Sequence, residues 1–252
     1  MSVEWPAETA GHIRYWANTG GRMPMATLSS IRSTFTAATP YLMYGLTEAF
    51  RSTYLDPAEI DRHPDSIGKA IPDAEVLVLD PEGRRCAPGE PGELVHRGPL
   101  VALGYWNDPV RTAERFRLFP HEGQPWRAPE RAVWSGDTVV ADEDGFLYFV
   151  ARADEMIKTS GYRVSPTEIE EAAYGTGLVY DAVAFGVDDA DFGQRIVLVV
   201  AGPSDGGAEL LGALRRALPL YMVPAVVECR DDLPRSPNGK FDRALIRQEA
   251  IV

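Results

Sequence analysis

Apolar runs and amphipathic segments alternate in the C-terminal part of the chain. The runs YDAVAFGVDD, RIVLVVAG and AVVECRD are apolar enough to predict strands. Residues 208–218, AELLGALRRAL, predict an amphipathic helix, and ALIRQEA predicts a closing helix. Another helix is expected in SPTEIEEAAYG, with Ser165 as N-cap, Pro166 at the first helical position and Glu168 completing a capping box. The alternation predicts a small α+β domain of about a hundred residues.

Short apolar runs separated by proline and glycine fill residues 60–150. AEVLVLD and GELVHRG predict strands, and DEDG predicts a hairpin turn, so we expect a β-rich antiparallel subdomain or a small barrel. Before it, the glycine turn NTGGRMP, a helical segment and the strand PYLM are typical of the end of an α/β unit. The chain therefore reads as if it enters a large N-terminal α/β domain partway.

The charged sequence ARADE separates these two parts of the chain. It follows the aromatic strand FLYFV and precedes MIKTSGYRV, in which Gly161 predicts a tight hairpin turn. We interpret the break as a hinge between two domains, residues 1–153 and 154–252. The alternative is an ordinary surface hairpin.

Charge and cysteine content narrow the classes of function. The chain has 25 basic and 37 acidic residues, and its net charge of −12 opposes nonspecific binding to nucleic acid. The charge does not oppose a phosphate ligand, because glycine loops and helix N-termini bind phosphate locally. Cys86 and Cys229 lie in unrelated contexts and indicate neither a disulfide framework nor a metal site. With no apolar run of membrane-spanning length and no signal-peptide pattern at the start, the expected compartment is the cytoplasm.

Two polar segments beside strands have the chemistry to contact a nucleotide. In YGLTEAF, a tight turn at Gly45 would place Thr47 and Glu48 at the carboxyl end of the strand PYLM. Tyr44 could stack on a flat base, Thr47 could donate to a phosphate, and Glu48 could hold Mg²⁺. An exposed Asp137, in a turn of WSGD, could accept hydrogen bonds from the vicinal hydroxyls of a ribose. The alternatives are a polar loop and an ordinary turn aspartate.

Six motifs in order resemble the adenylate-forming superfamily. They are YGLTE, GELVHRGPLVALGYWNDP, WSGD, ARADEMIKTSGYRVSPTEIE, LPLYMVP and NGKFDR, and with NTGGR the resemblance covers nearly the whole chain. That family includes acyl-CoA ligases, nonribosomal-peptide adenylation domains and luciferases. IKTSGYRVSPTEIE is most similar to AMP-forming acyl-CoA ligases, particularly those associated with exosortase systems.

The resemblance implies a two-step reaction with ATP, Mg²⁺ and a carboxylic acid. An acyl-adenylate and pyrophosphate form first, and then a thiol, usually of coenzyme A and in some members of a carrier protein, displaces AMP. The family's small C-terminal domain rotates between the steps. Roles in nucleotide binding are implied for a set of matching residues: Gly20, Gly21, Tyr44 and Gly45 around the adenine, Thr47 at phosphate, Glu48 at Mg²⁺, and Asp137 and Arg152 at ribose or phosphate.

The resemblance also assigns residues to each step. Asp154 would be the hinge residue. Lys240 would reach the α-phosphate and the acyl carboxylate in the first step, where a cation stabilises developing charge. Lys158 and Gly161 would face the site in the second step, where a glycine leaves room for a pantetheine arm. Two solvated surface lysines are the alternative.

One expected motif of the family is absent. Nothing before Asn18 resembles its phosphate loop, a Ser/Thr/Gly-rich run that ends in a lysine. The sequence therefore predicts the C-terminal portion of a ligase, inactive alone, whose remainder is lost or supplied by another chain. A non-catalytic residual fragment is the alternative. Smaller departures are Ala151 for the usual glycine, Trp134 for a common tyrosine, and Arg22 at a position where many members have a small residue.

Overall fold

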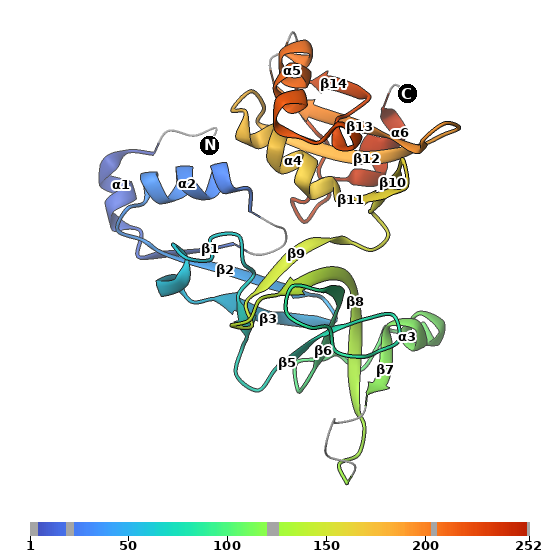
Figure 1. Cartoon of the computed structure of the whole chain (residues 1–252). Coiled ribbons are helices and arrows are strands. Elements are labelled where there is room, and N and C mark those ends of the chain that lie inside the picture. The colour runs from blue at the N-terminus through green and yellow to red at the C-terminus, as the bar shows by residue number, and fades with distance from the viewer. Residues whose placement is uncertain (1–4, 19–22, 120–125, 203–205, 251–252) are drawn as a thin grey trace. The chain divides into compact units, whose positions relative to one another are not determined.

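The computed structural model describes residues 5–18, 23–119, 126–202 and 206–250 (Figure 1). It divides into two compact units, one of Met1–Met23 and Ile31–Val150, the other of Pro24–Ser30 and Ala151–Val252. The main change of unit, at Val150, falls just before the boundary expected from the sequence. Among the helices described, none is both long and apolar enough to cross a membrane.

The first unit begins with a mixed four-stranded sheet in the order β1-β2-β3-β4. β1 runs parallel to β2, and the other pairs are antiparallel. The helical segment and strand expected early in the chain are confirmed as α2 and β2. The elements in this part of the chain are α1 (Ala7–His12), β1 (Tyr15–Asn18), α2 (Met25–Thr34), β2 (Thr39–Leu46), β3 (Ala49–Leu55), the 3₁₀ helix η1 (Pro57–Glu59) and β4 (Lys69–Ala70). The residues of α2 up to Ser30 belong to the second unit.

An antiparallel sheet in the order β5-β6-β8-β7, with β9 also paired to β8, confirms the predicted β-rich subdomain. The end strands β5 and β7 of that order do not pair with each other among the described residues, while Leu147 of β9 forms a bridge with Gly68 beside β4. The small-barrel alternative stays a prediction. Leu77, Val95 and Ala132 lie in its core. The elements are β5 (Glu75–Leu79), β6 (Pro91–Arg97), α3 (Pro109–Arg115), β7 (Phe116–Phe119), β8 (Glu130–Ala141) and β9 (Leu147–Arg152).

The second unit contains a five-stranded sheet in the order β11-β10-β13-β12, with β14 parallel to β13. The predicted alternation of strands and helices is confirmed. The elements are β10 (Ile157–Thr159), β11 (Tyr162–Val164), α4 (Pro166–Gly175), β12 (Asp181–Asp189), β13 (Gly193–Ala201), α5 (Gly207–Ala217), the 3₁₀ helix η2 (Leu220–Met222), β14 (Val226–Arg230) and α6 (Arg243–Glu249).

Both faces of this sheet are buried, which explains why β12 and β13 read as continuous apolar runs. Successive side chains on a strand point to opposite faces. One face, with Ala184 and Leu198, shares a core with residues of α4 and α5. The other, with Val183 and Val197, packs in a second core with Ile246 of α6. Figure 1 shows α4, α5 and α6 around this sheet.

The start of α4 differs from the sequence prediction in one bond. Ser165 is the N-cap and Pro166 follows it, as expected, but the Ser165 side chain makes no capping hydrogen bond. The backbone carbonyl of Ser165 instead accepts the Glu168 amide at 3.2 Å. The amide of the third helical residue, which a capping side chain usually accepts, is thus bonded to the Ser165 backbone. The predicted capping box is therefore wrong, although the helix begins where it was expected.

Candidate functional site

The segment YGLTE lies at the end of β2 and in the turn that follows. The strand continues through Leu46, so the turn falls on Thr47 and Glu48, and the prediction of a tight turn at Gly45 is wrong. The register between β2 and β3 shifts just after Tyr44. A Cβ atom at Gly45 would lie 2.2 Å from the backbone nitrogen of Arg51. The glycine is needed because two backbones approach closely in this bulge.

Glu48 is held from its backbone and from its side chain. Its carbonyl oxygen accepts the Ala102 amide at 2.8 Å, and the Tyr105 hydroxyl donates to its Oε1. Burial, with a smaller contribution from Glu48, raises the pKa of Tyr105, so the phenol is a donor at neutral pH. Sequence reasoning missed Tyr105, because the contact joins residues far apart in the chain.

The turn has the donor set that a magnesium–nucleotide complex needs. Thr47 is exposed and Glu48 is half-buried. Mg²⁺ is usually bound through one or two carboxylates together with substrate phosphates, so a single glutamate beside a hydroxyl fits. A protein-only metal cage is a different arrangement, and the described residues contain no group of three or more His, Cys, Asp or Glu that could hold an ion.

Asp137 lies inside the long strand β8 and is only 7% exposed, which corrects the expectation of an exposed turn aspartate. Its Oδ2 accepts a hydrogen bond from the Tyr44 hydroxyl at 2.5 Å. The structure therefore brings together two of the predicted nucleotide-binding residues. An ionised carboxylate can accept several hydrogen bonds, so this contact is compatible with a further donor such as a ribose hydroxyl.

A bulge, rather than a turn, gives the motif WSGD its shape. Gly136 has φ +75°, and its amide donates to Oε1 of Glu93 at 2.9 Å. The Ser135 hydroxyl donates to the Leu94 carbonyl at 2.6 Å and accepts the Asp137 amide at 3.0 Å. The register between β6 and β8 shifts at the same place. A bulge redirects side chains, and here it sets the position of the Asp137 carboxyl.

His96 lies next to this pair and has no exposed surface. Its ring stacks on Tyr44, with ring centroids 6.0 Å apart and planes 17° apart. Neither ring nitrogen has a hydrogen-bond partner in the part of the chain that the structure describes. Burial lowers the pKa of His96 to about 4, so the ring is neutral at physiological pH. The ring is therefore a neutral, buried packing partner of Tyr44.

Arg152, expected at the nucleotide, and Asp154, expected at the hinge, lie near the start of the second unit. The Arg152 Nε donates to Asp154 Oδ1 at 3.3 Å, and the two side chains are 37% and 73% exposed. Such an exposed ion pair contributes little to stability. The Glu155 amide donates to the Arg152 carbonyl at 3.1 Å, which closes a turn across the ARADE break.

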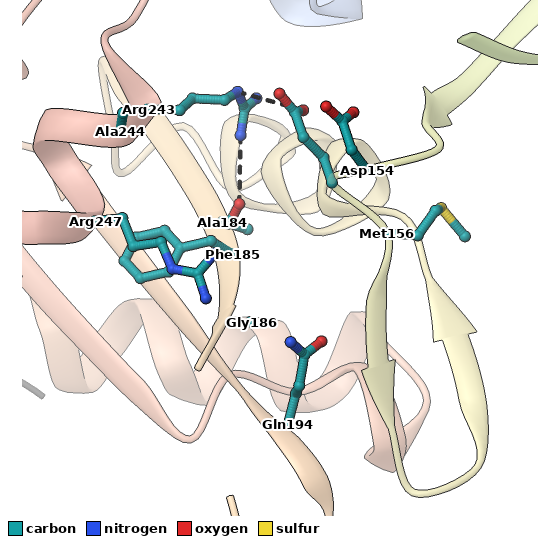
Figure 2. Close-up of a pocket in the computed structure, with 10 residues that line it drawn as sticks. Asp154, Met156, Ala184, Phe185, Gly186, Gln194, Arg243, Ala244 and Arg247 are labelled. Atoms are coloured by element: carbon teal, nitrogen blue, oxygen red, sulfur yellow. Dashed lines mark hydrogen bonds and ion pairs between the residues drawn. The ribbon is translucent and has the colours of Figure 1, made fainter. Parts of the chain in front are cut away.

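A cavity of about 170 Å³ lies beside this turn, within the second unit (Figure 2). Arg243 from α6 borders it and donates to the Ala184 carbonyl at 3.3 Å. Its other contacts are two bonds to the Glu170 carboxylate, at 2.8 and 3.0 Å, and an ion pair with Glu155 at 3.7 Å. Burial raises the pKa of Glu170, while Arg243 opposes that effect. Arg243 thus joins α4, β12 and the segment after the break.

Lys158 lies on the short hairpin β10–β11, which confirms the predicted tight turn. Ser160 and Gly161 both have positive φ, 52° and 81°, as a two-residue hairpin of type I′ requires. The Lys158 side chain is exposed, and its amide donates to Oε1 of Gln194 at 2.8 Å. A Cβ at Gly161 would meet nothing within 4 Å, so neighbouring atoms of the structure do not demand a glycine there; its backbone conformation favours one.

Lys240 and Lys158 are set at opposite ends of β12. Thr159, next to Lys158, pairs with Gly193, and Gly193 pairs with Asp189 at the last position of the strand. The Lys240 loop reaches the first position, because Arg235 in that loop donates to Asp181 Oδ2 at 2.8 Å. At a rise of about 3.3 Å per residue, the strand spans roughly 26 Å between these ends. The side chain of Lys240 is exposed.

The predicted site residues thus fall into groups. Tyr44 and Asp137 are in contact, and Thr47 and Glu48 share the turn after β2. Gly45 lies on β2 in the first unit, and the remaining described residues, Arg152, Asp154, Lys158, Gly161 and Lys240, belong to the second unit. Gly20 and Gly21 lie outside the described residues. Long-range contacts such as those of Tyr105, Arg235 and Gln194 have no local sequence signal.

Two parts of the chain match known families. Residues 3–106 match the AMP-binding enzyme family, and residues 168–240 match the AMP-binding enzyme C-terminal domain. The long-chain-fatty-acid–CoA ligase of Escherichia coli O157:H7 is 39% identical over 209 residues, which are 82% of this chain and 35% of that protein. A linear gramicidin synthase protein of Brevibacillus parabrevis is 38% identical over 204 residues, 79% of this chain and 4% of that protein.

A solved structure shows the same fold. The crystal structure of ATP-bound MatB from Rhodopseudomonas palustris superposes with a TM-score of 0.79 at 29% identity, covering 96% of this chain and 46% of MatB. The mixed α+β and α/β fold expected from the sequence is confirmed. The chain spans less than half the length of MatB and about a third of the E. coli ligase.

Proposed function

The chain belongs to the family of AMP-binding, adenylate-forming enzymes, and on that premise we propose that it is the C-terminal portion of an AMP-forming acid–thiol ligase. In the first step a carboxylate oxygen attacks the α-phosphorus of ATP, and pyrophosphate leaves. In the second step a thiol sulfur attacks the acyl carbon, and AMP leaves as the acyl–oxygen bond breaks. The reaction needs ATP and coenzyme A, which makes the cytoplasm the expected compartment.

The proposed nucleotide site uses the contacts of the first unit. The Asp137 carboxylate, positioned by the WSGD bulge, accepts hydroxyls of the ribose, and Tyr44 beside it lines the adenine site. Thr47 donates to phosphate, and Glu48, held by Tyr105, would bind Mg²⁺. The ion supplies charge neutralisation for the leaving pyrophosphate. Gly20, Gly21, Gly45 and Arg152 complete the proposed site, and Asp154 is the proposed hinge.

The observation that carries the proposal is the placement of Lys158 and Lys240 at opposite ends of β12. The two steps have different transition states at one carboxyl group, so we expect a different side chain to stabilise each of them. Lys158 on β10 and Lys240 in its loop are linked through neighbouring residues to opposite ends of β12, which are roughly 26 Å apart, so we do not expect both lysines to contact that carboxyl group at once. We therefore assign Lys240 to adenylate formation and Lys158, with Gly161, to thioester formation.

Separate half-reaction assays test this assignment. The enzyme would be a hybrid in which this chain follows the N-terminal part of the E. coli O157:H7 ligase. We expect Lys240→Ala to slow acid-dependent ATP–pyrophosphate exchange by about 100-fold, because a preorganised cation is lost. It should largely spare thioester formation from supplied acyl-adenylate. Lys158→Ala should slow thiol capture and leave exchange close to normal, since a mutation affects the step whose transition state the residue contacts.

Loss of the same half-reaction in both variants, to the same degree, would contradict the assignment. Arg230→Met is a matched control, because it removes a cation of the second unit that bonds Glu228 and Glu249 instead of the proposed site. We expect both half-reactions of this variant to stay within about twofold of the parent.

The class of carboxylic acid and the identity of the thiol donor are separate, narrower proposals. The name of the E. coli relative supports a long-chain fatty acid. The preference for exosortase-associated ligases rests on IKTSGYRVSPTEIE alone and stays a prediction. The 38% sequence identity with a linear gramicidin synthase protein supports a carrier protein as the alternative thiol donor. Comparing coenzyme A with a phosphopantetheinylated carrier as acceptor in the second half-reaction distinguishes the two.

A further inference from the structure

The loop that carries Lys240 is closed by its own backbone. Arg235 and Phe241 form an antiparallel bridge across it. Inside the bridge, the Ser236 amide donates to the Lys240 carbonyl at 2.7 Å, and the Gly239 amide donates to the Ser236 carbonyl at 2.8 Å. Gly239 has φ +78°, a conformation that glycine adopts at low cost. The loop therefore has one defined backbone conformation.

The Arg235 side chain ties this loop to the sheet. Its Nη1 donates to the Gly239 carbonyl at 3.1 Å, and its Nη2 donates to Asp181 Oδ2 at 2.8 Å. The guanidinium carbon lies 4.2 Å from the centroid of the Phe241 ring. A planar guanidinium can donate in two directions and stack on an aromatic ring at once, which an ammonium group cannot do.

The contact with Gly239 bears directly on Lys240. The carbonyl group of Gly239 and the amide nitrogen of Lys240 belong to the same planar peptide unit. Fixing that carbonyl toward Arg235 fixes the plane from which the Lys240 Cα projects. Because Asp181 is the first residue of β12, this contact anchors the peptide to a strand whose next five residues are buried.

We propose that Arg235 is a positioning residue for Lys240. It holds the Gly239–Lys240 peptide against the start of β12. The backbone at Lys240 therefore keeps one orientation, and the side chain extends from a fixed position. The inference rests on the proposed role of Lys240 in adenylate formation. A merely structural role for Arg235 would disturb both half-reactions alike, whereas a positioning role disturbs only the one that uses Lys240.

The first test uses the 252-residue chain and measures hydrogen exchange by mass spectrometry. Arg235→Met should accelerate exchange of the peptide spanning residues 236–241 by about tenfold or more, and leave β12 and β13 protected. Arg235→Lys should behave like Arg235→Met, since it keeps the charge but loses the two-pronged geometry. Arg230→Met, which breaks ion pairs with Glu228 and Glu249, should leave 236–241 unchanged. Unchanged exchange of 236–241 in Arg235→Met would overturn the proposal.

The second test uses the half-reactions of the hybrid enzyme. Arg235→Met and Arg235→Lys should each slow adenylate formation about tenfold and keep thioester formation within about twofold. Adding Arg235→Met to Lys240→Ala should cause no further loss, because residues that act as a unit are not additive. Equal loss of both half-reactions, or normal adenylate formation, would overturn the positioning role.

The two proposals fail in different ways. If Lys240→Ala itself leaves adenylate formation intact, the assignment of Lys240 in the proposed function is wrong. If Lys240→Ala slows that step and Arg235→Met does not, the assignment of Lys240 stands and the inference on Arg235 is wrong.

Discussion

At the residue scale, His96 combines complete burial with two ring nitrogens that have no partner among the described residues. Burial lowers its pKa from 6.5 to about 4, so the folded first unit resists protonation of this ring. The unfolded chain binds the proton more readily between these values. The contribution of His96 to stability is therefore lost as the pH falls through 6.5, and stability rises with pH across this range.

We expect His96→Leu to make the free energy of unfolding less dependent on pH. Between pH 7 and pH 5 the parent should lose about 2 kcal/mol more than the variant, because the neutral leucine removes this linkage. Urea unfolding followed by tryptophan fluorescence measures it in the first unit, since all 5 tryptophans precede residue 151. His12→Leu, which removes an exposed histidine, is the control. An identical pH dependence in His96→Leu and the parent would disprove the account.

The sequence motifs identified individual site residues, but they did not predict the contacts between those residues. The motif YGLTE indicated Tyr44, and WSGD indicated Asp137, but not the hydrogen bond between them. The bulge at Gly136 depends on Glu93 from another strand, and the bulge at Gly45 depends on Arg51. Tertiary contacts of this kind leave no pattern in the local sequence, so both segments read as turns.

At the scale of secondary-structure elements, the position of β10 depends on a small set of contacts around Gly186. A Cβ there would lie 2.7 Å from Gln194 Oε1 and 2.9 Å from a methyl carbon of Ile157. Gln194 uses that oxygen to accept the Lys158 amide. The close packing of Gly186 thus leaves room for the glutamine that holds the strand carrying Lys158; Figure 2 shows both Gly186 and Gln194 at the cavity.

We expect Gly186→Ala to destabilise the second unit by about 1–3 kcal/mol, as overpacking of a core does. The Gln194 side chain should be displaced, so exchange of the Lys158 amide should accelerate more than that of β12. Hydrogen exchange resolved by NMR would measure both. Gly212→Ala on helix α5 is the control, because its Cβ would have no neighbour closer than 3.8 Å and alanine favours helix. Equal stability of the two variants would contradict the packing argument.

Elements were more predictable than their ends. The apolar runs of β12 and β13 and the amphipathic pattern of α5 follow from burial and periodicity, which operate over many residues. The sequence pattern predicts a capping bond of the Ser165 side chain, but it does not reveal that the Glu168 amide donates to the Ser165 backbone carbonyl. The order of strands in each sheet likewise depends on contacts between distant segments.

At the scale of the whole molecule, the chain holds two compact units and less than half the length of its solved relative MatB. No segment before Asn18 resembles the phosphate loop of the family. We therefore expect the 252 residues alone to give no acid-dependent ATP–pyrophosphate exchange, since we expect that loop to hold the β- and γ-phosphates. The hybrid enzyme is the positive control. Clear exchange in a homogeneous preparation of the chain alone would refute this.

The nine-residue length of β12 sets a scale for the motion that the proposed reaction demands. Lys240 is linked to one end of the strand and Lys158 to the other. If the two lysines act in turn at a single carboxyl group, the second unit must move by a distance comparable with the length of β12. Side-chain rotation is too short to cover such a distance. A label on each unit, read by distance-dependent fluorescence in the hybrid, should therefore report two well-separated values, one for each chemical step.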